Sequence, residues 1–494
     1  MRLLKNVIAN IVGKLWSFIS IYLFIPIYIK VLGIESYGII AFYTVLQTFL
    51  TFVDIGLTAT LNREFAKEVG DTTYKIELLR TFEYIYLGLA GLIYCGTFIF
   101  APQIAAEFLE SDTIAPSDVV QYVRLMGLTI GCNIFVYLYQ GGLIGLQRQV
   151  TANVLLVAFN AIKTGLVILP LWFWSNLYTF FFWQLGCTFL FCWVIRHYLR
   201  SYLIFADVKP NFAHLKRLWR YTAGMILMSV IYAANTQIDK LAVGELFSLT
   251  YFSYYFLAVT VGQAVLMLVT PLSMAFLPEL TRLFSIPDIS GAKQLYHKFA
   301  FLVTAFAAGV SIMLFFYAEP FITIWQHDEQ ISKAITPMAC LFILSFFFLS
   351  IQIAPYNLAL ANGYVRTNVI MGLLTVALLW PGIYWFVGWF GLIGAAMPRL
   401  ILSAIFTLIL GYIIIKRYLR GQFSRWLFQD TLLPIAITIL TALPLYYIFR
   451  MLPQGYWTIM YGLIICGISF LANGCVFLKL YSNLDLKQLM NSNR

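Results

Sequence analysis

Apolar segments long enough to cross a lipid bilayer recur along the whole of this 494-residue chain. A helix rises 1.5 Å per residue, so about 20 apolar residues span the roughly 30 Å hydrocarbon core of a membrane. Fourteen segments approach or exceed this length: 7–30, 37–61, 82–106, 119–146, 150–173, 177–196, 219–243, 251–277, 298–324, 335–361, 365–388, 391–415, 429–449 and 457–479. The sequence therefore predicts an all-α integral membrane protein with about 14 transmembrane helices.

The balance of residue types agrees with a membrane protein. Hydrophobic residues make up 61% of the chain and charged residues 11%, whereas soluble domains carry about 25% charged residues. The net charge is +11, and in a membrane protein such an excess usually reflects cytoplasmic loops rather than nucleic-acid binding. The first apolar segment is long and lacks a small-residue cleavage site, so we interpret it as a membrane helix and not as a cleaved signal.

The distribution of Lys and Arg predicts how the chain is oriented in the membrane. With the N-terminus in the cytoplasm, 24 of the 32 basic residues fall on cytoplasmic loops and helix ends. Four fall on the opposite side, namely Lys30, Lys240, Lys333 and Arg450. Since basic loops are retained on the inner side of a membrane, this bias predicts cytoplasmic N- and C-termini. The outer loops are all short, which leaves no room for a soluble domain on the outer side.

A long basic inner loop near residues 197–218 divides the first twelve segments into six and six. We predict an N-terminal six-helix lobe at 1–200, a cytoplasmic linker at 201–218, a C-terminal six-helix lobe at 219–420, two additional transmembrane helices at 421–480 and a cytoplasmic tail at 481–494. A weak repeat supports the halves, because Gly-x-x-Arg turns follow both the fourth and the tenth segment, at Gly145 to Arg148 and at Gly363 to Arg366. Parallel halves of this kind imply a central cavity between two lobes.

The sequence contains no arrangement of residues typical of an enzyme. His197, His214 and His297 are predicted to lie at cytoplasmic loops, and no His has a partner at metal-ligand spacing. The seven Cys residues form no CxxC motif, and there is no GxxxxGK[ST] loop for ATP. We therefore expect no enzymatic activity, no metal and no cofactor. If the protein needs energy, it must come from an ion gradient, a partner or the substrate gradient.

Four basic residues fall inside predicted membrane helices, and they are listed here as candidates for binding an anionic group: Lys14, Lys163, Arg124 and Arg399. Cations inside a membrane are costly unless they face water or a partner. Their sign suits a phosphate, a pyrophosphate or an acidic sugar. The alternative for each residue is a side chain that reaches the interface or forms a structural ion pair, and Lys14 and Lys163 are the deeper two.

Two acidic residues with basic neighbours are candidates for gating or ion coupling. Asp54 lies inside the second segment, and we expect it to pair with Lys14 or Arg63, either as an inner gate or as a fixed structural pair. Asp239 and Lys240 lie near the outer end of the seventh segment. They suit an interfacial anchor, or a cation site or gate.

Two motifs resemble those of bacterial polysaccharide transporters, the Wzx-type lipid-linked oligosaccharide flippases of the MOP (multidrug/oligosaccharidyl-lipid/polysaccharide) superfamily. The first is Leu32-Gly33-Ile34-Glu35-Ser36-Tyr37-Gly38 followed by Asp54-Ile55-Gly56-Leu57. The second is Gln237-Ile238-Asp239-Lys240-Leu241-Ala242-Val243-Gly244. The resemblance extends over essentially the full length, and it implies the MATE/MOP-like fold of two six-helix lobes plus two C-terminal helices.

The resemblance implies that undecaprenyl-pyrophosphate-linked repeat units of O-antigen, capsule or exopolysaccharide are flipped to the periplasmic leaflet of a bacterial inner membrane. The lobes would alternate in access, driven by H⁺ or Na⁺, and the polysaccharide polymerase and chain-length machinery are further expected partners. A lipid II flippase and a MATE-type drug/cation antiporter are the alternatives within the superfamily. A membrane polysaccharide polymerase is the alternative from another class, although such enzymes usually need a sizeable outer loop.

Overall fold

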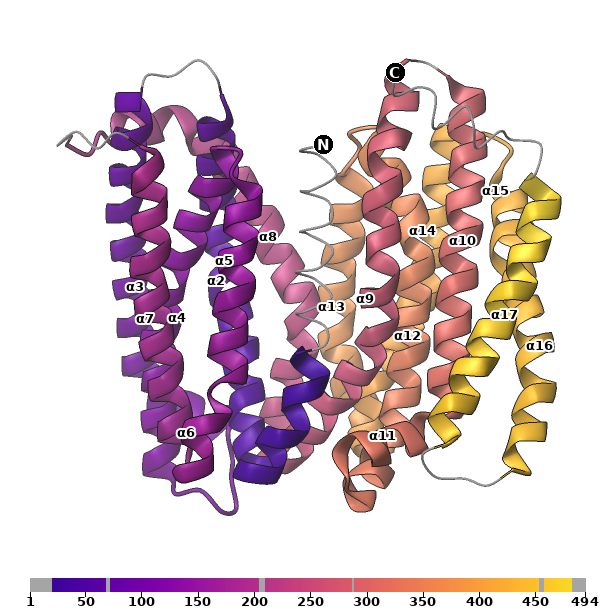
Figure 1. The fold of residues 1–494 in the computed structure, drawn as a ribbon, viewed down its shortest axis with the longest axis horizontal. Coiled ribbons are helices and arrows are strands. Elements are labelled where there is room, and N and C mark those ends of the chain that lie inside the picture. Colours follow the sequence, from indigo (N-terminus) through magenta and orange to yellow (C-terminus); the bar gives the residue numbers. More distant parts are fainter. Residues whose placement is uncertain (1–19, 68–71, 204–208, 287, 453–456, 482–494) are drawn as a thin grey trace. The chain divides into compact units, whose positions relative to one another are not determined.

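The computed structural model describes residues 20–67, 72–203, 209–286, 288–452 and 457–481, and every regular element in these ranges is a helix (Figure 1). Within them, ten helices are long and apolar enough to cross a membrane, or eleven if the bent helix α2 is counted as one span. The predicted all-α membrane protein is thereby confirmed. The predicted number of 14 transmembrane helices is not confirmed.

The difference in number has three local causes. The first predicted segment lies largely outside the described residues, which begin with a short helix at Ser20–Leu32. The seventh lies within helix α8, Ala213–Leu246, which is not among the spans because its sequence is comparatively polar. The eleventh and twelfth form one apolar stretch, Arg366–Tyr418. A 3-10 turn at Gly391–Ala396 divides that stretch into two helices, and Gly391 adopts a positive φ of 58° there.

The described chain separates into two compact units, Met1–Phe256 and Leu257–Arg494. The first unit holds the helix Ser20–Leu32 together with α2 (Ile34–Ala66), α3 (Thr72–Phe108), α4 (Pro116–Gly145), α5 (Gln149–Asn160), α6 (Ile168–Phe173), α7 (Leu177–Tyr202), α8 and the first turns of α9 (Leu249–Ser285). Helix α8 packs along α2 in this unit. The division into lobes at residues 201–218 stays a prediction.

Helix α4 packs closely on both α2 and α3, and small residues make this possible. A Cβ atom at Gly145 would lie 2.6 Å from the Cβ of Phe65 on α2. One at Gly131 would lie 3.2 Å from the carbonyl oxygen of Ala90 on α3. Since lipid tails are as apolar as the side chains, membrane helices associate mainly through such close contacts and through hydrogen bonds.

The second unit continues α9 and adds α10 (Ile289–Phe316), α11 (Ala318–Gln326), α12 (Glu329–Ala361), α13 (Arg366–Phe390), α14 (Met397–Tyr418), α15 (Phe423–Arg425), a π turn η3 (Trp426–Leu432), α16 (Leu433–Arg450) and α17 (Trp457–Tyr481).

The predicted bounds 298–324 for the ninth segment are wrong. Helix α10 starts at Ile289 because Asp288 accepts the N–H of Gly291 at 2.9 Å as an N-cap, and it ends before the separate helix α11.

The last two helices, α16 and α17, pack on each other and on α10 (yellow in Figure 1). Polar side chains join them: Asn473 donates to the Thr438 hydroxyl at 3.0 Å, and the hydroxyls of Thr441 and Ser469 lie 2.9 Å apart. Because no water is present inside a bilayer to satisfy such groups, the hydrogen bonds fix the register of the two helices.

Candidate functional site

Lys163 lies at a break in a membrane helix. The helix Gln149–Phe173 widens at a π turn, Ala161–Gly165, where the N–H of Leu166 reaches the carbonyl of Ala161 at 3.3 Å. Pro170 follows within the same helix and has no N–H to donate to an earlier carbonyl. Such π turns within α-helices are frequent at functional sites.

Side chains from neighbouring helices satisfy the carbonyl groups of the π turn. Trp183 and Gln184 on α7 donate to the carbonyls of Ile162 and Lys163, at 3.2 and 3.1 Å. The hydroxyl of Tyr28, on the helix Ser20–Leu32, donates to the carbonyl of Thr164. The irregular backbone around Lys163 is therefore held from two sides by protein groups.

The Lys163 ammonium group faces aromatic rings. The residue is 6% exposed, and its Nζ lies 5.3 Å from the ring centre of Phe159 and 6.0 Å from that of Tyr43. Phe191 on α7 stacks on Phe159 with 4.3 Å between ring centres. In the described part of the chain, no carboxylate forms an ion pair with Lys163. Aromatic faces attract a cation, but they do not neutralise it, so this position can accept an anionic group.

The other predicted cations lie elsewhere. Arg124 on α4 places its guanidinium carbon 4.3 Å from the ring centre of Phe98, so it belongs to the contact between α4 and α3. Arg399 is buried on α14 in the second unit, where its carbonyl accepts a hydrogen bond from Ser345 at 3.4 Å. Lys14 falls outside the described residues. A shared site for these cations therefore stays a prediction.

Asp54 is held by hydroxyl groups at the bend of α2. The parts Ile34–Phe52 and Gly56–Ala66 are inclined by 51°. The carboxylate accepts hydrogen bonds from Thr58, at 2.7 Å, and from Tyr86 on α3. Among the described residues it does not pair with Arg63, which is exposed in the last turn of α2, so that expected pair is not formed. Among the described residues, Asp54 is bound by two hydroxyl donors and by no cation, and the expected pair with Lys14 lies outside these residues.

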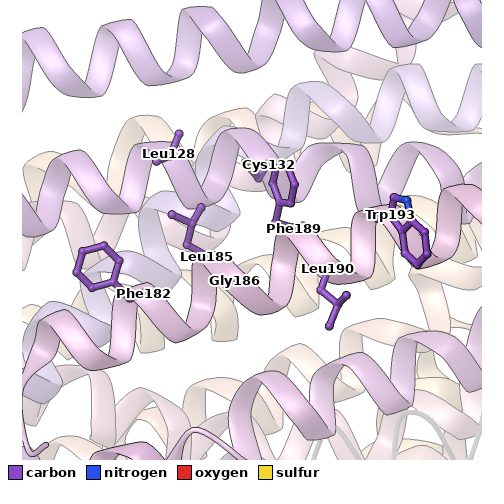
Figure 2. A pocket seen from close by; sticks show the side chains of 8 residues that line it. All are labelled: Leu128, Cys132, Phe182, Leu185, Gly186, Phe189, Leu190 and Trp193. Atoms are coloured by element: carbon purple, nitrogen blue, oxygen red, sulfur yellow. The ribbon is translucent and has the colours of Figure 1, made fainter.

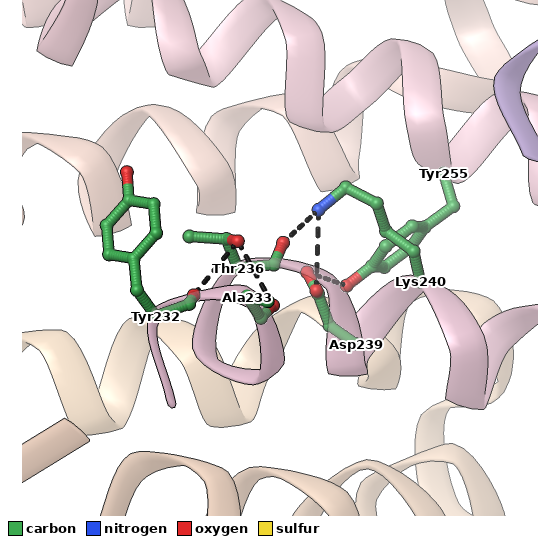
Figure 3. Close-up of polar contacts among 6 residues, drawn as sticks. All are labelled: Tyr232, Ala233, Thr236, Asp239, Lys240 and Tyr255. Carbon is green, nitrogen blue, oxygen red and sulfur yellow. Dashed lines mark hydrogen bonds and ion pairs between the residues drawn. The ribbon is translucent and has the colours of Figure 1, made fainter. Parts of the chain in front are cut away.

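Asp239 and Lys240 are both buried on α8 and contact each other (Figure 3). The Lys240 ammonium lies 3.4 Å from Asp239 and donates to the carbonyl of Thr236 at 2.6 Å. Tyr255 on α9 donates its hydroxyl to the other Asp239 oxygen at 3.0 Å. The pair joins α8 to α9, which fits a structural anchor as well as a gate.

A buried polar cluster in the second unit was missed by the sequence reasoning. His297 was expected at a loop, but it lies inside α10, fully buried, and its Nδ1 hydrogen-bonds to Asp430 of the π turn η3. Asp430 also accepts the hydroxyl of Tyr481 on α17 at 2.7 Å, and the other His297 nitrogen meets Gln422 at 3.1 Å. His297 and Asp430 lie 133 residues apart in the sequence. The only signal for this pair would have been that both side chains are buried, and the sequence does not show their burial.

An apolar groove of about 640 Å³ runs between α4 and α7 (Figure 2). Figure 2 shows the six residues from α7 and the two from α4 that line it: Leu128, Cys132, Phe182, Leu185, Gly186, Phe189, Leu190 and Trp193. No lining residue is charged, so the groove does not suit a phosphate group.

Comparison with known sequences places these features in a family. Residues 3–284, more than half of the chain, match the family model described as polysaccharide biosynthesis protein. The chain belongs to this family. A protein of Shigella flexneri described as an O-antigen transporter is 20% identical over 417 residues, which cover 82% of this chain and 96% of that protein.

Solved structures with the same fold belong to transporters. The lipid II flippase MurJ in an inward closed conformation superposes with a TM-score of 0.72 at 13% identity, covering 96% of this chain and 98% of its own. A multidrug resistance MATE transporter of the MOP superfamily, in an inward-facing conformation, reaches a TM-score of 0.68 at 14% identity, covering 84% and 95%. The predicted MOP-type fold is therefore confirmed.

Proposed function

We propose that this protein flips undecaprenyl-pyrophosphate-linked oligosaccharide repeat units from the cytoplasmic to the periplasmic leaflet of a bacterial inner membrane. The repeat units would serve O-antigen, capsule or exopolysaccharide synthesis. The family and the O-antigen transporter of Shigella flexneri support a role in polysaccharide export. The proposed activity is transport and involves no covalent chemistry.

Lys163 is the observation that carries this proposal. A buried ion costs several kcal/mol after relaxation, and in the described structure the lysine has aromatic rings instead of a carboxylate beside it. A pyrophosphate would supply the opposite charge, and the rings of Tyr43 and Phe159 offer flat surfaces for a sugar. The pyrophosphate of a lipid-linked sugar would thus bind the lysine, and the sugar would stack on the aromatic rings.

The transport cycle that we propose is alternating access of two six-helix lobes, 1–200 and 219–420, coupled to H⁺ or Na⁺. Cations that could extend the pyrophosphate site are Lys14, Arg124 and Arg399. Asp54, Arg63, Asp239 and Lys240 are proposed for gating or coupling. Both chain ends would face the cytoplasm, in agreement with the bias of basic residues.

A lipid II flippase remains the second candidate. The likeness to MurJ covers 96% of this chain, whereas the MATE structure covers 84%. The longer match to MurJ is a likeness of fold, and it is the observation that puts this candidate beside the first. Lipid II and a polysaccharide repeat unit share the pyrophosphate, so only the sugar carried can separate them.

The decisive experiment deletes the gene and analyses the lipid-linked intermediates and the surface polysaccharide. We expect undecaprenyl-linked repeat units to accumulate on the inner leaflet and the surface polymer to disappear. Lys163→Ala should fail to restore the polymer, while Lys333→Ala, which removes an exposed lysine, should restore it fully. Normal export of single, unpolymerised units would indicate a polymerase, and normal polymer with new sensitivity to cationic dyes would indicate a drug exporter.

A further inference from the structure

The two motifs that the sequence analysis singled out meet in the first unit. The first motif opens helix α2, and Gly33 there adopts a positive φ of 87°. The second motif ends at Gly244, just before the turn from α8 to α9. A Cβ atom at Gly244 would lie 3.5 Å from the carbonyl of Phe108, the last residue of α3. The start of α2, the end of α3 and the α8–α9 turn therefore form one contact region.

Glu35 is the polar centre of this region. The residue is buried, and its Oε2 accepts hydrogen bonds from the Ser111 hydroxyl at 2.5 Å and from the N–H and hydroxyl of Thr113 at 3.1 and 2.6 Å. Its Oε1 accepts the hydroxyl of Thr250 at 3.3 Å. One carboxylate oxygen thus binds the α3–α4 loop, and the other binds the start of α9.

Two further hydrogen bonds join the same segments. The hydroxyl of Ser253 on α9 donates to the carbonyl of Ile34 at 2.9 Å. The N–H of Leu249 donates to the carbonyl of Glu110 in the α3–α4 loop, also at 2.9 Å. Together with Thr250, three donors of the first α9 turns bind acceptors of α2 and of this loop.

Packing leaves little space between these segments. A Cβ atom at Gly38 would lie 2.6 Å from the Ser253 hydroxyl and 2.9 Å from the Leu249 carbonyl, so only glycine fits. The ring of Phe42 packs 6.2 Å from that of Phe252 and 6.1 Å from that of Phe108, measured between centres. Apolar packing at Phe42 thus stands beside the hydrogen bonds of Glu35, which are only partly buried.

The α8–α9 hairpin is braced from within, which makes it a unit that can move as a whole. Tyr255 on α9 binds Asp239 on α8, as Figure 3 shows. Asp239 and Lys240 contact each other on the same helix. The second motif thus stiffens the hairpin, while the first supplies the carboxylate that the hairpin binds.

From this arrangement we propose that Glu35, with its partner Thr250 and the close contact at Gly38, is the latch that keeps the outer side of the transporter closed. The inference rests on the proposed alternating access of the predicted lobes 1–200 and 219–420. These lobes divide α2 and the α3–α4 loop from the α8–α9 hairpin, whereas in this conformation α2, the α3–α4 loop and the α8–α9 turn all pack within the first compact unit. Residues 32–35, 107–118 and 244–250 all lie at predicted outer ends. Opening to the outside would separate these segments.

The chemistry of the latch suits repeated opening. Within the described residues, Glu35 accepts four hydrogen bonds, all from hydroxyl or backbone N–H groups, so no ion pair among them has to be separated when the hairpin leaves. Three of these bonds stay with Glu35 in its own lobe, and only that from Thr250 is lost. Water from the outer side can replace one neutral donor.

The test uses Leu249→Cys as a reporter, because Leu249 is fully buried in this conformation. A membrane-impermeant thiol reagent is added to spheroplasts, and the chain without this substitution gives the background from the seven native cysteines. Adding Thr250→Val removes the bond across the interface. One such hydrogen bond shifts the equilibrium about fivefold, so we expect about fivefold faster labelling. Gly38→Ala should accelerate labelling as well, because its methyl group forces the segments apart.

Thr113→Val is the matched control, since it removes a bond to the same carboxylate within one lobe. It should change the labelling rate less than about twofold. Equal rates for Thr250→Val and the reporter alone would overturn the latch, and so would equal acceleration by Thr113→Val, because Glu35 would then only hold the fold together. Labelling needs no substrate, so a failed deletion phenotype overturns the proposed function and leaves this test valid.

Discussion

Lys163 in the first unit and His297 in the second are both buried basic side chains, but their surroundings differ. Lys163 lies within a π turn, and His297 lies on α10 and contacts a π turn. His297 meets the carboxylate of Asp430 and the amide of Gln422. In the described structure, the Lys163 ammonium group faces the rings of Phe159 and Tyr43 and forms no ion pair with a carboxylate. The comparison teaches that a buried basic side chain with a carboxylate partner from the protein, such as His297, holds helices together. A buried basic side chain without such a partner, such as Lys163, is suited to bind an anionic ligand.

His297→Ala should have the largest effect on stability. Removing one partner of a buried pair leaves the carboxyl group of Asp430 without its His297 hydrogen bond, and breaking such a pair costs about 3–5 kcal/mol. We expect a lower unfolding temperature of the detergent-solubilised protein and a lower amount in the membrane. Replacing His297 and Asp430 together by Leu should recover most of the loss, because neither member of the pair is then left buried without the other. An unchanged unfolding temperature in the single variant would contradict the structural role of the pair.

Lys163→Met should have the opposite effect on stability. It removes a buried cation and keeps an apolar side chain of similar length, so the unfolding temperature should stay equal or rise. Transport should nevertheless fall about 10- to 100-fold, because a hydrogen bond to a charged group contributes about 1.5–3 kcal/mol. Thermal unfolding and surface-polymer quantification measure the two quantities. A destabilised but active Lys163→Met protein would show that the lysine is structural.

Tyr86→Phe tests whether Asp54 resembles His297 or Lys163. The change removes a hydrogen-bond donor from a buried carboxylate, which should cost about 1–3 kcal/mol of unfolding free energy. Tyr84→Phe is the matched control, because Tyr84 lies on the same helix and is 55% exposed. It should change stability by less than about 0.5 kcal/mol. If both variants unfold at the same temperature, Tyr86 does not stabilise Asp54.

Asn473→Ala should have the smallest effect. The amide donates to Thr438 across α16 and α17, and hydrogen bonds between membrane helices average about 0.6 kcal/mol. We expect a decrease of this size in unfolding free energy and unchanged transport. A loss above about 2 kcal/mol would show that this pair is as important for stability as the pair of His297 and Asp430.

Much of the fold could be predicted from the sequence because a membrane helix is encoded by a local run of apolar residues. Lys163 could be selected for the same reason, since a cation within such a run is visible without neighbours. The bounds of the helices and the hydrogen-bond partners of buried side chains could not be predicted as well. The start of α10 depends on the Asp288 cap, and the pairing of His297 with Asp430 depends on the packing of helices far apart in the chain.

The candidate site shows the same limit. The sequence singled out Asp54 but suggested Lys14 or Arg63 as a partner, whereas the described residues provide hydroxyl groups from Thr58 and Tyr86. No role was expected for Glu35, because a carboxylate at the start of a helix is common in protein sequences. Only the meeting of the α3–α4 loop with α9 makes that residue stand out. Partners that come from several helices are set by tertiary packing, which periodicity does not encode.

The π turn at Lys163 also bears on how the protein is made. Inserted alone, its helix would expose to lipid a cation that costs about 2.5–3.5 kcal/mol at the membrane centre, together with backbone carbonyls that lack donors. The donors are Trp183 and Gln184 on the next long helix, α7, and Tyr28 on an earlier one. During synthesis, this segment is therefore expected to leave the insertion machinery together with α7, as a pre-assembled hairpin, rather than helix by helix.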